Sequence, residues 1–194
     1  MRTMPETPAA RTALDVAARF CSPALLNHSV RAYLWAVSYG EAHGIPYDDE
    51  LLCVSALLHD IGLTAAFDSH TTPFEEAGGN LAWVFARASG WPEERARRAA
   101  EIIVQHMRDD VSPSVDPESH LLQVSTSWDV SGRRPEEFAP ELRTRVLGRY
   151  PRLGFGPEFR CLFEEQARRK PLSAAAETVR DGIAGRIAAN PLDA

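Results

Sequence analysis

Apolar residues recur at helical spacing along most of the chain, and short stretches rich in glycine, proline and charge separate these repeats. No stretch shows the alternation of apolar and polar residues that is typical of a half-buried strand. The helices that this pattern predicts cover about residues 9–20, 23–43, 48–60, 75–89, 92–107, 117–130, 135–149, 158–169 and 172–189. We therefore expect an all-α fold, with one domain of about eight helices over residues 1–194, a core at about 22–132 and C-terminal helices over 135–189 that pack on it.

The predicted helix over 48–60 ends in a histidine and an aspartate side by side. Its acidic first turn suits the positive end of the helix dipole, and Gly62 is placed to end it in a left-handed cap. His59 and Asp60 therefore lie in the last turn and offer one nitrogen and one oxygen ligand near the same point. Such a pair is common by chance, so it becomes informative only if neighbouring helices carry similar ligands.

Three other predicted helices carry residues of this kind. His28 lies near the start of the second helix, His106 ends the fifth and Asp129 ends the sixth. Taken singly, each can be a polar helix residue that a hydrogen bond satisfies. Taken as an ordered set with the His-Asp pair, His28 and Asp129 favour a metal site.

The order His28, His59-Asp60, Asp129 resembles the metal-ligand pattern of the HD-domain superfamily. Five short motifs, in that family's order across roughly residues 27–132, resemble its cyanamide-hydratase-like branch. The motifs are Asn27-His28-Ser29, His59-Asp60-Ile61-Gly62, Phe74-Glu75-x-x-Gly78-Gly79, Ile103-x-x-His106 and Trp128-Asp129-Val130-x-Gly132. The resemblance implies an HD-type helical bundle and a divalent metal ion bound by His28, His59, Asp60 and Asp129.

Two imidazoles and two carboxylates make a mixed nitrogen and oxygen site without a thiolate, which argues against a structural zinc cluster. Zn²⁺ and Fe²⁺ are the ions we expect first, and Mn²⁺ also accepts such ligands. Two-metal members of the superfamily carry another histidine where this chain has Phe74, so we expect one ion. His70, in the preceding loop, is the residue that could replace the missing ligand.

Three residues are candidates for the catalytic groups. His106 could hydrogen-bond the metal-bound water or hold substrate, although a histidine at a helix end is also favoured by the helix dipole. Glu75 could carry a proton, although a first-turn carboxylate is favoured on the same grounds. Asp60 is expected to take part both as a ligand and in the chemistry.

Three further residues are candidates for substrate binding. Arg31 lies one turn after His28 and could contact substrate, although pairing with an acidic neighbour is the favoured reading. Phe74 and His70 flank the loop after the His-Asp pair. We expect the loops over 63–73 and 150–157 to shape the pocket.

Large apolar residues in the predicted helices are expected in the core. Trp35, Trp83 and Trp128 recur at spacings that suit packing, and Val84 is expected to face inward.

Composition narrows the class of partner. The net charge of −6 argues against a general nucleic-acid surface, and no apolar run approaches the ~20 residues of a membrane span. The N-terminus has no apolar signal core, and the 3 cysteines are far apart without a C-x-x-C pair. We therefore expect a cytoplasmic protein with a small-molecule substrate, no nucleic-acid or membrane partner, and self-association left open.

Residues 32–86, which we expect to supply much of the pocket wall, contain no Lys or Arg. A dianionic phosphate entering there would meet carboxylates, whereas a neutral molecule would not. We therefore expect a metal-dependent hydratase or hydrolase that acts on a small neutral molecule, and the resemblance suggests a cyanamide- or nitrile-like one. The alternative is a phosphohydrolase of nucleotides or other phosphate esters, with Arg108, Arg133 and Arg134 reaching in from later loops. A further alternative is a non-catalytic metal-binding helical protein.

Overall fold

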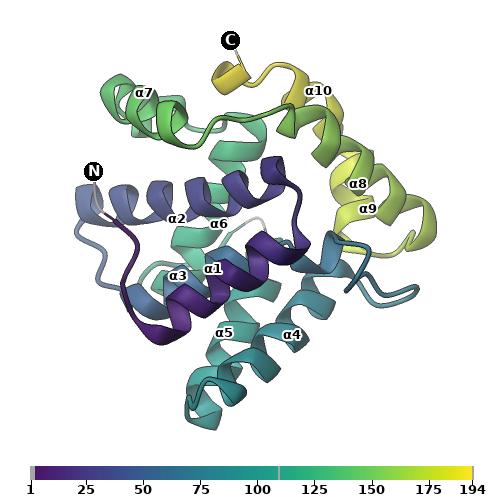
Figure 1. Ribbon diagram of the computed structural model, residues 1–194. Helices are drawn as coiled ribbons and strands as arrows, with labels where there is room; N and C mark the ends of the chain where they lie inside the picture. Colours follow the sequence, from purple (N-terminus) through teal and green to yellow (C-terminus); the bar gives the residue numbers. More distant parts are fainter. Residues whose placement is uncertain (1–2, 109, 194) are drawn as a thin grey trace.

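The computed structural model describes residues 3–108 and 110–193, which form 10 α-helices and 3 short 3₁₀ helices and include no strand (Figure 1). The α-helices are α1 (Pro8–Phe20), α2 (Pro23–His43), α3 (Asp49–Leu58), α4 (Phe74–Ala88), α5 (Glu93–Gln105), α6 (Pro117–Ser131), α7 (Pro140–Arg149), α8 (Phe155–Arg169), α9 (Ala174–Arg180) and α10 (Ile183–Ala188). The 3₁₀ helices are η1 (Ile61–Leu63), η2 (Pro135–Glu137) and η3 (Pro191–Asp193). The predicted all-α class is confirmed.

The helix count exceeds the expected eight partly because the last predicted helix is two helices. Gly182 separates α9 from α10 and has φ 78°, a left-handed conformation that glycine adopts without a Cβ penalty. The segment before α7 also differs from the prediction, because Pro135 begins a 3₁₀ turn and the α-helix starts only at Pro140.

The helices pack in two groups. α2 lies against α3 and α6, α1 lies across α3, and α4 runs beside α5 (Figure 1). α8, α9 and α10 gather on one side of the molecule and contact the rest mainly through α2 and α6. In the described part of the chain, no helix is both long enough and apolar enough to cross a bilayer.

Two apolar clusters fill the interior. The larger one includes Trp35, Trp128 and Phe138, all at most 1% exposed, with Trp128 and Phe138 stacked at 4.9 Å between ring centroids. The smaller one contains Phe155, Phe159 and Phe163 of α8 together with Phe74. This second cluster joins the C-terminal helices to the region around the His-Asp pair.

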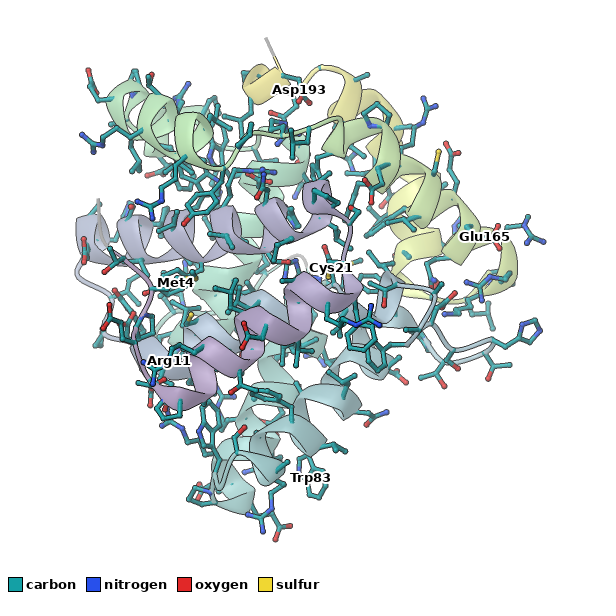
Figure 2. The ribbon with its side chains drawn as sticks, viewed as in Figure 1. Met4, Arg11, Cys21, Trp83, Glu165 and Asp193 are labelled. Carbon is teal, nitrogen blue, oxygen red and sulfur yellow. The ribbon has the colours of Figure 1, made fainter. Side chains whose placement is uncertain are left out.

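Trp83 and Val84 do not face the core as the spacing predicts. They are 39% and 61% exposed, and Figure 2 places Trp83 at the surface of α4. After the first turn of α4, its buried residues are all small, namely Gly78, Gly79, Ala82 and Ala86. A Cβ on Gly79 would lie 3.0 Å from the Ala100 carbonyl oxygen, so the close approach of α5 to this face excludes larger side chains.

Gly62 does not form the expected left-handed cap. α3 ends at Leu58, and Gly62 belongs to η1 without a positive φ. A Cβ added at Gly62 would lie 2.1 Å from the carbonyl oxygen of Phe74. Glycine is therefore required because the first turn of α4 packs directly on the turn that carries His59 and Asp60.

We expect Gly62→Ala to destabilise the fold by about 2 kcal/mol or more, because the new methyl group overlaps backbone that must then move. Gly148→Ala is the matched control: a Cβ there meets no atom within 4 Å, and its φ is not positive. The control should stabilise α7 by roughly 0.5–1 kcal/mol. Urea unfolding followed by circular dichroism measures both, and equal free energies of unfolding for the two variants would contradict the close-approach explanation.

Candidate metal centre

The structure brings three of the predicted ligands together. His28 comes from the first half of α2, while His59 and Asp60 come from the turn after α3. The His28 Nε2 atom lies 3.2 Å from His59 Nε2 and 3.3 Å from Asp60 Oδ2, and His59 Nε2 lies 3.1 Å from the same oxygen. All three side chains are at most 1% exposed.

This triangle of atoms fits a divalent ion. Ligand atoms that each lie about 2.0–2.2 Å from one ion, at tetrahedral or octahedral angles, are separated by roughly 3.0–3.5 Å. Among the described residues, neither carboxylate oxygen of Asp60 has a hydrogen-bond partner, although both are buried. A buried carboxylate without hydrogen bonds is costly unless it binds a cation. The three residues therefore have the donor types, spacing and unsatisfied charge that a metal ion requires.

Hydrogen bonds fix the direction of both imidazoles. His59 Nδ1 donates to the Ala56 carbonyl oxygen at 2.7 Å, and His28 Nδ1 donates to Asp129 Oδ2 at 2.7 Å. With the proton on Nδ1, the lone pair of each ring is on Nε2, the atom that faces the triangle. A carboxylate or carbonyl behind a metal-binding histidine is the usual way in which proteins orient this ligand.

Asp129 lies outside the group of candidate ligand atoms, so this geometry does not support the prediction that it is a fourth direct ligand. The group of atoms that lie within 4.8 Å of one another consists of His28, His59 and Asp60. Asp129 lies on the far side of the His28 ring, where it accepts hydrogen bonds from Arg31 Nε and Nη2 at 2.8 and 2.7 Å and from Trp35 Nε1 at 2.8 Å. The buried guanidinium offsets its charge, and Asp129 contacts the group of candidate ligands through the Nδ1 atom of His28.

Burial and neighbouring charge shift the pKa values of these groups in opposite directions. Burial tends to raise the pKa of Asp60, but the His59 and His28 imidazoles outweigh it and hold this pKa well below its usual range. Burial likewise opposes ionisation of Asp129, and Arg31 with His28 holds its pKa far down. For His28, burial lowers the pKa, whereas the hydrogen bond to Asp129 and the negative charge of Asp60 raise it, and the net direction is upward.

His106 lies beside this centre as the motif suggests. Its ring centroid is 5.0 Å from that of His59, and its Nδ1 donates to the Ile103 carbonyl oxygen, which leaves Nε2 without a proton. Burial, followed by the nearby His59, lowers the pKa of His106 to about 4, so the imidazole is neutral near pH 7. A neutral ring with an open Nε2 can accept a hydrogen bond or a proton.

The remaining candidates lie behind the centre or away from it. Arg31 is fully buried and paired with Asp129, as the favoured reading predicts. Phe74 is also fully buried, with its ring centroid 5.9 Å from that of His106, and His70 is exposed in the loop before α4. Glu75 is buried, one of its oxygens has no hydrogen-bond partner among the described residues, and burial raises its pKa.

A cavity of about 440 Å³ opens from the metal centre. Its wall consists of His28, His59, Asp60, His106, Met107, Arg108, Gln123, Thr126, Ser127, Val130, Ser131, Arg133, Phe159, Phe163, Ala174, Glu177, Thr178, Asp181, Ile183 and Arg186. Arg31, Phe74, His70 and Glu75 are not part of this wall, so a role for any of them in substrate binding or proton transfer would act through another group.

The prediction that residues 32–86 supply much of the pocket wall is wrong. Of residues 32–86, His59 and Asp60 alone line the cavity, and the loops over 63–73 and 150–157 contribute nothing to it. Aromatic packing explains why: Phe155 stacks on His28 at 4.4 Å between ring centroids, and Phe74 packs beside His106. These rings close two sides of the centre, so it opens toward α6 and the C-terminal helices.

Sequence reasoning missed several residues at the centre. Gln123, Thr126 and Ser127 line the cavity from α6, and their polar side chains at helical spacing were the available signal. Arg152 has no comparable signal. Its Nη1 donates to the Asp129 backbone carbonyl at 2.8 Å and its Nη2 to Asp193 Oδ2 at 3.0 Å, which only the folded chain brings near.

Comparison with known proteins agrees with this geometry. The HD domain model matches residues 25–144, and the chain belongs to the HD-domain family. The chain is also similar to two proteins of Saccharomyces cerevisiae, cyanamide hydratase DDI2 and cyanamide hydratase DDI3. Each is 27% identical over 172 residues, which cover 86% of this chain and 76% of the relative. The resemblance read from the five motifs is therefore confirmed as a distant relationship.

We expect His59→Ala to remove most of the bound metal, because it deletes one of three converging ligands. His43→Ala is the matched control, since His43 is a partly exposed histidine at the far end of α2 that pairs with Glu137. Elemental analysis of both purified variants measures the effect. Equal metal content in His59→Ala and wild type would contradict the assignment, and two equivalents of metal per chain would contradict a single ion.

Asp129→Asn separates an orienting role from direct ligation. If Asp129 acts through His28, the amide keeps most of the shape and metal affinity should fall roughly 10–100-fold. Competition against a chelator of known affinity measures this change without any need for turnover. A loss of binding as complete as that of His59→Ala would show that Asp129 is itself a ligand.

Proposed function

We propose that this protein is a metal-dependent hydratase or hydrolase that acts on a small molecule with a neutral reacting group, such as a nitrile or an amide. The observation that carries the proposal is a buried set of metal ligands, His28, His59 and Asp60, at the wall of a cavity that a small molecule can enter. The relationship to two cyanamide hydratases supports this reaction class. One bound ion is expected, with Zn²⁺ or Fe²⁺ preferred by the mixed ligand set.

A bound divalent ion would supply Lewis acidity, which polarises a substrate and lowers the pKa of water from ~15.7 towards ~7. His28, His59 and Asp60 would hold it, and the hydrogen bonds that the two imidazoles donate to Ala56 and Asp129 keep both Nε2 lone pairs turned toward it. His106 presents its open Nε2 in the same wall and is placed to accept a proton from water and return it to the substrate nitrogen.

A phosphohydrolase is the second candidate, and one observation favours it. Arg108, Arg133 and Arg186 line the cavity, as this alternative expects of Arg108 and Arg133, whereas Arg134 is not part of the wall. Glu177 and Asp181 line it as well, and these carboxylates oppose the arginines. The near balance of charge gives less support to a dianionic phosphate than an arginine-rich wall would.

A screen of two paired substrate groups distinguishes the proposed reactions. Cyanamide and small nitriles form one group, nucleoside monophosphates form the other, and each is assayed with Zn²⁺, Fe²⁺, Mn²⁺ and Co²⁺. We expect amide or urea formation from the first group, abolished in His59→Ala and retained in His43→Ala. Robust phosphate release with the same variant pattern would replace this proposal by the second candidate. No turnover of either group by fully metal-loaded protein would favour a non-catalytic metal-binding protein.

A further inference from the structure

The cavity is far larger than cyanamide requires. Cyanamide occupies about twice the volume of a water molecule, or roughly 60 Å³. The cavity measures about 440 Å³, which lies in the range that accommodates ligands the size of drugs or cofactors. Building on the proposed function, we infer that the substrate is an organic nitrile or amide much larger than cyanamide, with an aromatic or branched apolar body and a hydrogen-bonding substituent.

One wall of the cavity suits the apolar body. Phe159 and Phe163 of α8 line it with ring centroids 4.3 Å apart, and both are held from behind by the smaller apolar cluster. Val130 and Ile183 extend the same surface from α6 and α10. Fixed aromatic faces of this kind bind flat or branched apolar groups, whereas a molecule as small as cyanamide would leave them in contact with water.

A polar part of the wall, on α6, suits the hydrogen-bonding substituent. Gln123, Ser127 and Ser131 stand at four-residue intervals on α6 and line the cavity together. Gln123 Nε2 donates to Ser127 Oγ at 3.3 Å, and Ser131 Oγ donates to the Ser127 carbonyl oxygen at 2.8 Å. The Gln123 side-chain carbonyl has no hydrogen bond to a described residue, so this wall offers an acceptor within the cavity.

The charged residues at the cavity do not select for a strongly charged substrate. Outside the group of candidate ligands, the wall contains three basic residues and two acidic ones, namely Arg108, Arg133, Arg186, Glu177 and Asp181. The opposite charges largely offset one another, so the wall favours a neutral body with a polar substituent over a strongly charged molecule.

The test fills the outer part of the cavity and compares ligands of two sizes. Thr178→Trp places an indole in the wall contributed by α9, and Arg180→Trp adds the same group to the exposed surface of that helix as a control. The substrates are cyanamide and 3-hydroxybenzonitrile, and the binding probes are urea and 3-hydroxybenzamide, measured by calorimetry with zinc-loaded protein. We expect wild type to favour 3-hydroxybenzonitrile over cyanamide by at least about tenfold in kcat/KM.

Thr178→Trp should lower kcat/KM for 3-hydroxybenzonitrile by about tenfold or more relative to its effect on kcat/KM for cyanamide. The same substitution should weaken binding of 3-hydroxybenzamide by about tenfold or more. Arg180→Trp should change neither quantity. Binding separates the two proposals. If 3-hydroxybenzamide binds and Thr178→Trp weakens it, but no nitrile is hydrated, the proposed reaction fails and the size inference stands. If cyanamide is hydrated while the aromatic compounds neither bind nor react, the reaction stands and the size inference is overturned.

Discussion

The buried ion pair between Arg31 and Asp129 is the interaction on which the rest of the centre depends. Both side chains are fully buried, and the guanidinium meets the carboxylate through Nε and Nη2. A buried charge is expensive, and removing one partner of such a pair typically costs about 3–5 kcal/mol. Because Arg31 lies on α2 and Asp129 on α6, the pair fixes how these helices face each other, and it leaves Asp129 placed to hold the His28 ring.

The second constraint is the aromatic packing around the histidines. Phe155, Phe159 and Phe163 project from one face of α8, and Phe155 stacks on His28 while Phe74 packs between Phe163 and His106. These rings exclude water from two sides of the centre and leave the cavity as its remaining opening. A centre enclosed in this way strengthens every electrostatic interaction inside it, because the local dielectric is low.

The two halves of the site come from different parts of the chain. The ligands His28, His59 and Asp60 lie within residues 25–144, the region that matches the HD domain. Much of the cavity wall, including Phe159, Phe163 and the residues of α9 and α10, lies after that region. The candidate metal ligands and the α6 wall of the cavity therefore lie within the family match, whereas the aromatic wall comes from α8, which the match does not include.

The sequence alone determined most of the helices and the candidate metal ligands, because both depend on local signals. Apolar periodicity, the acidic first turn of the third helix, and the vicinal His59-Asp60 pair each act over a few residues, and the structure agrees with them. Local sequence does not determine which side chains face one another across two helices. Whether Asp129 faces the ion or the back of His28 depends on the position of Arg31 about one hundred residues away.

The tertiary structure also decided which surfaces are buried and which line the cavity. Helical spacing cannot tell that α4 turns its small residues inward and Trp83 outward, since that choice follows from how closely α5 approaches. It cannot tell that Gly62 is needed for the approach of Phe74 rather than for a left-handed turn. The cavity wall was predicted from residues that lie near the ligands in sequence. In the folded chain, α8, α9 and α10 pack on the open side of the centre and supply part of the wall instead.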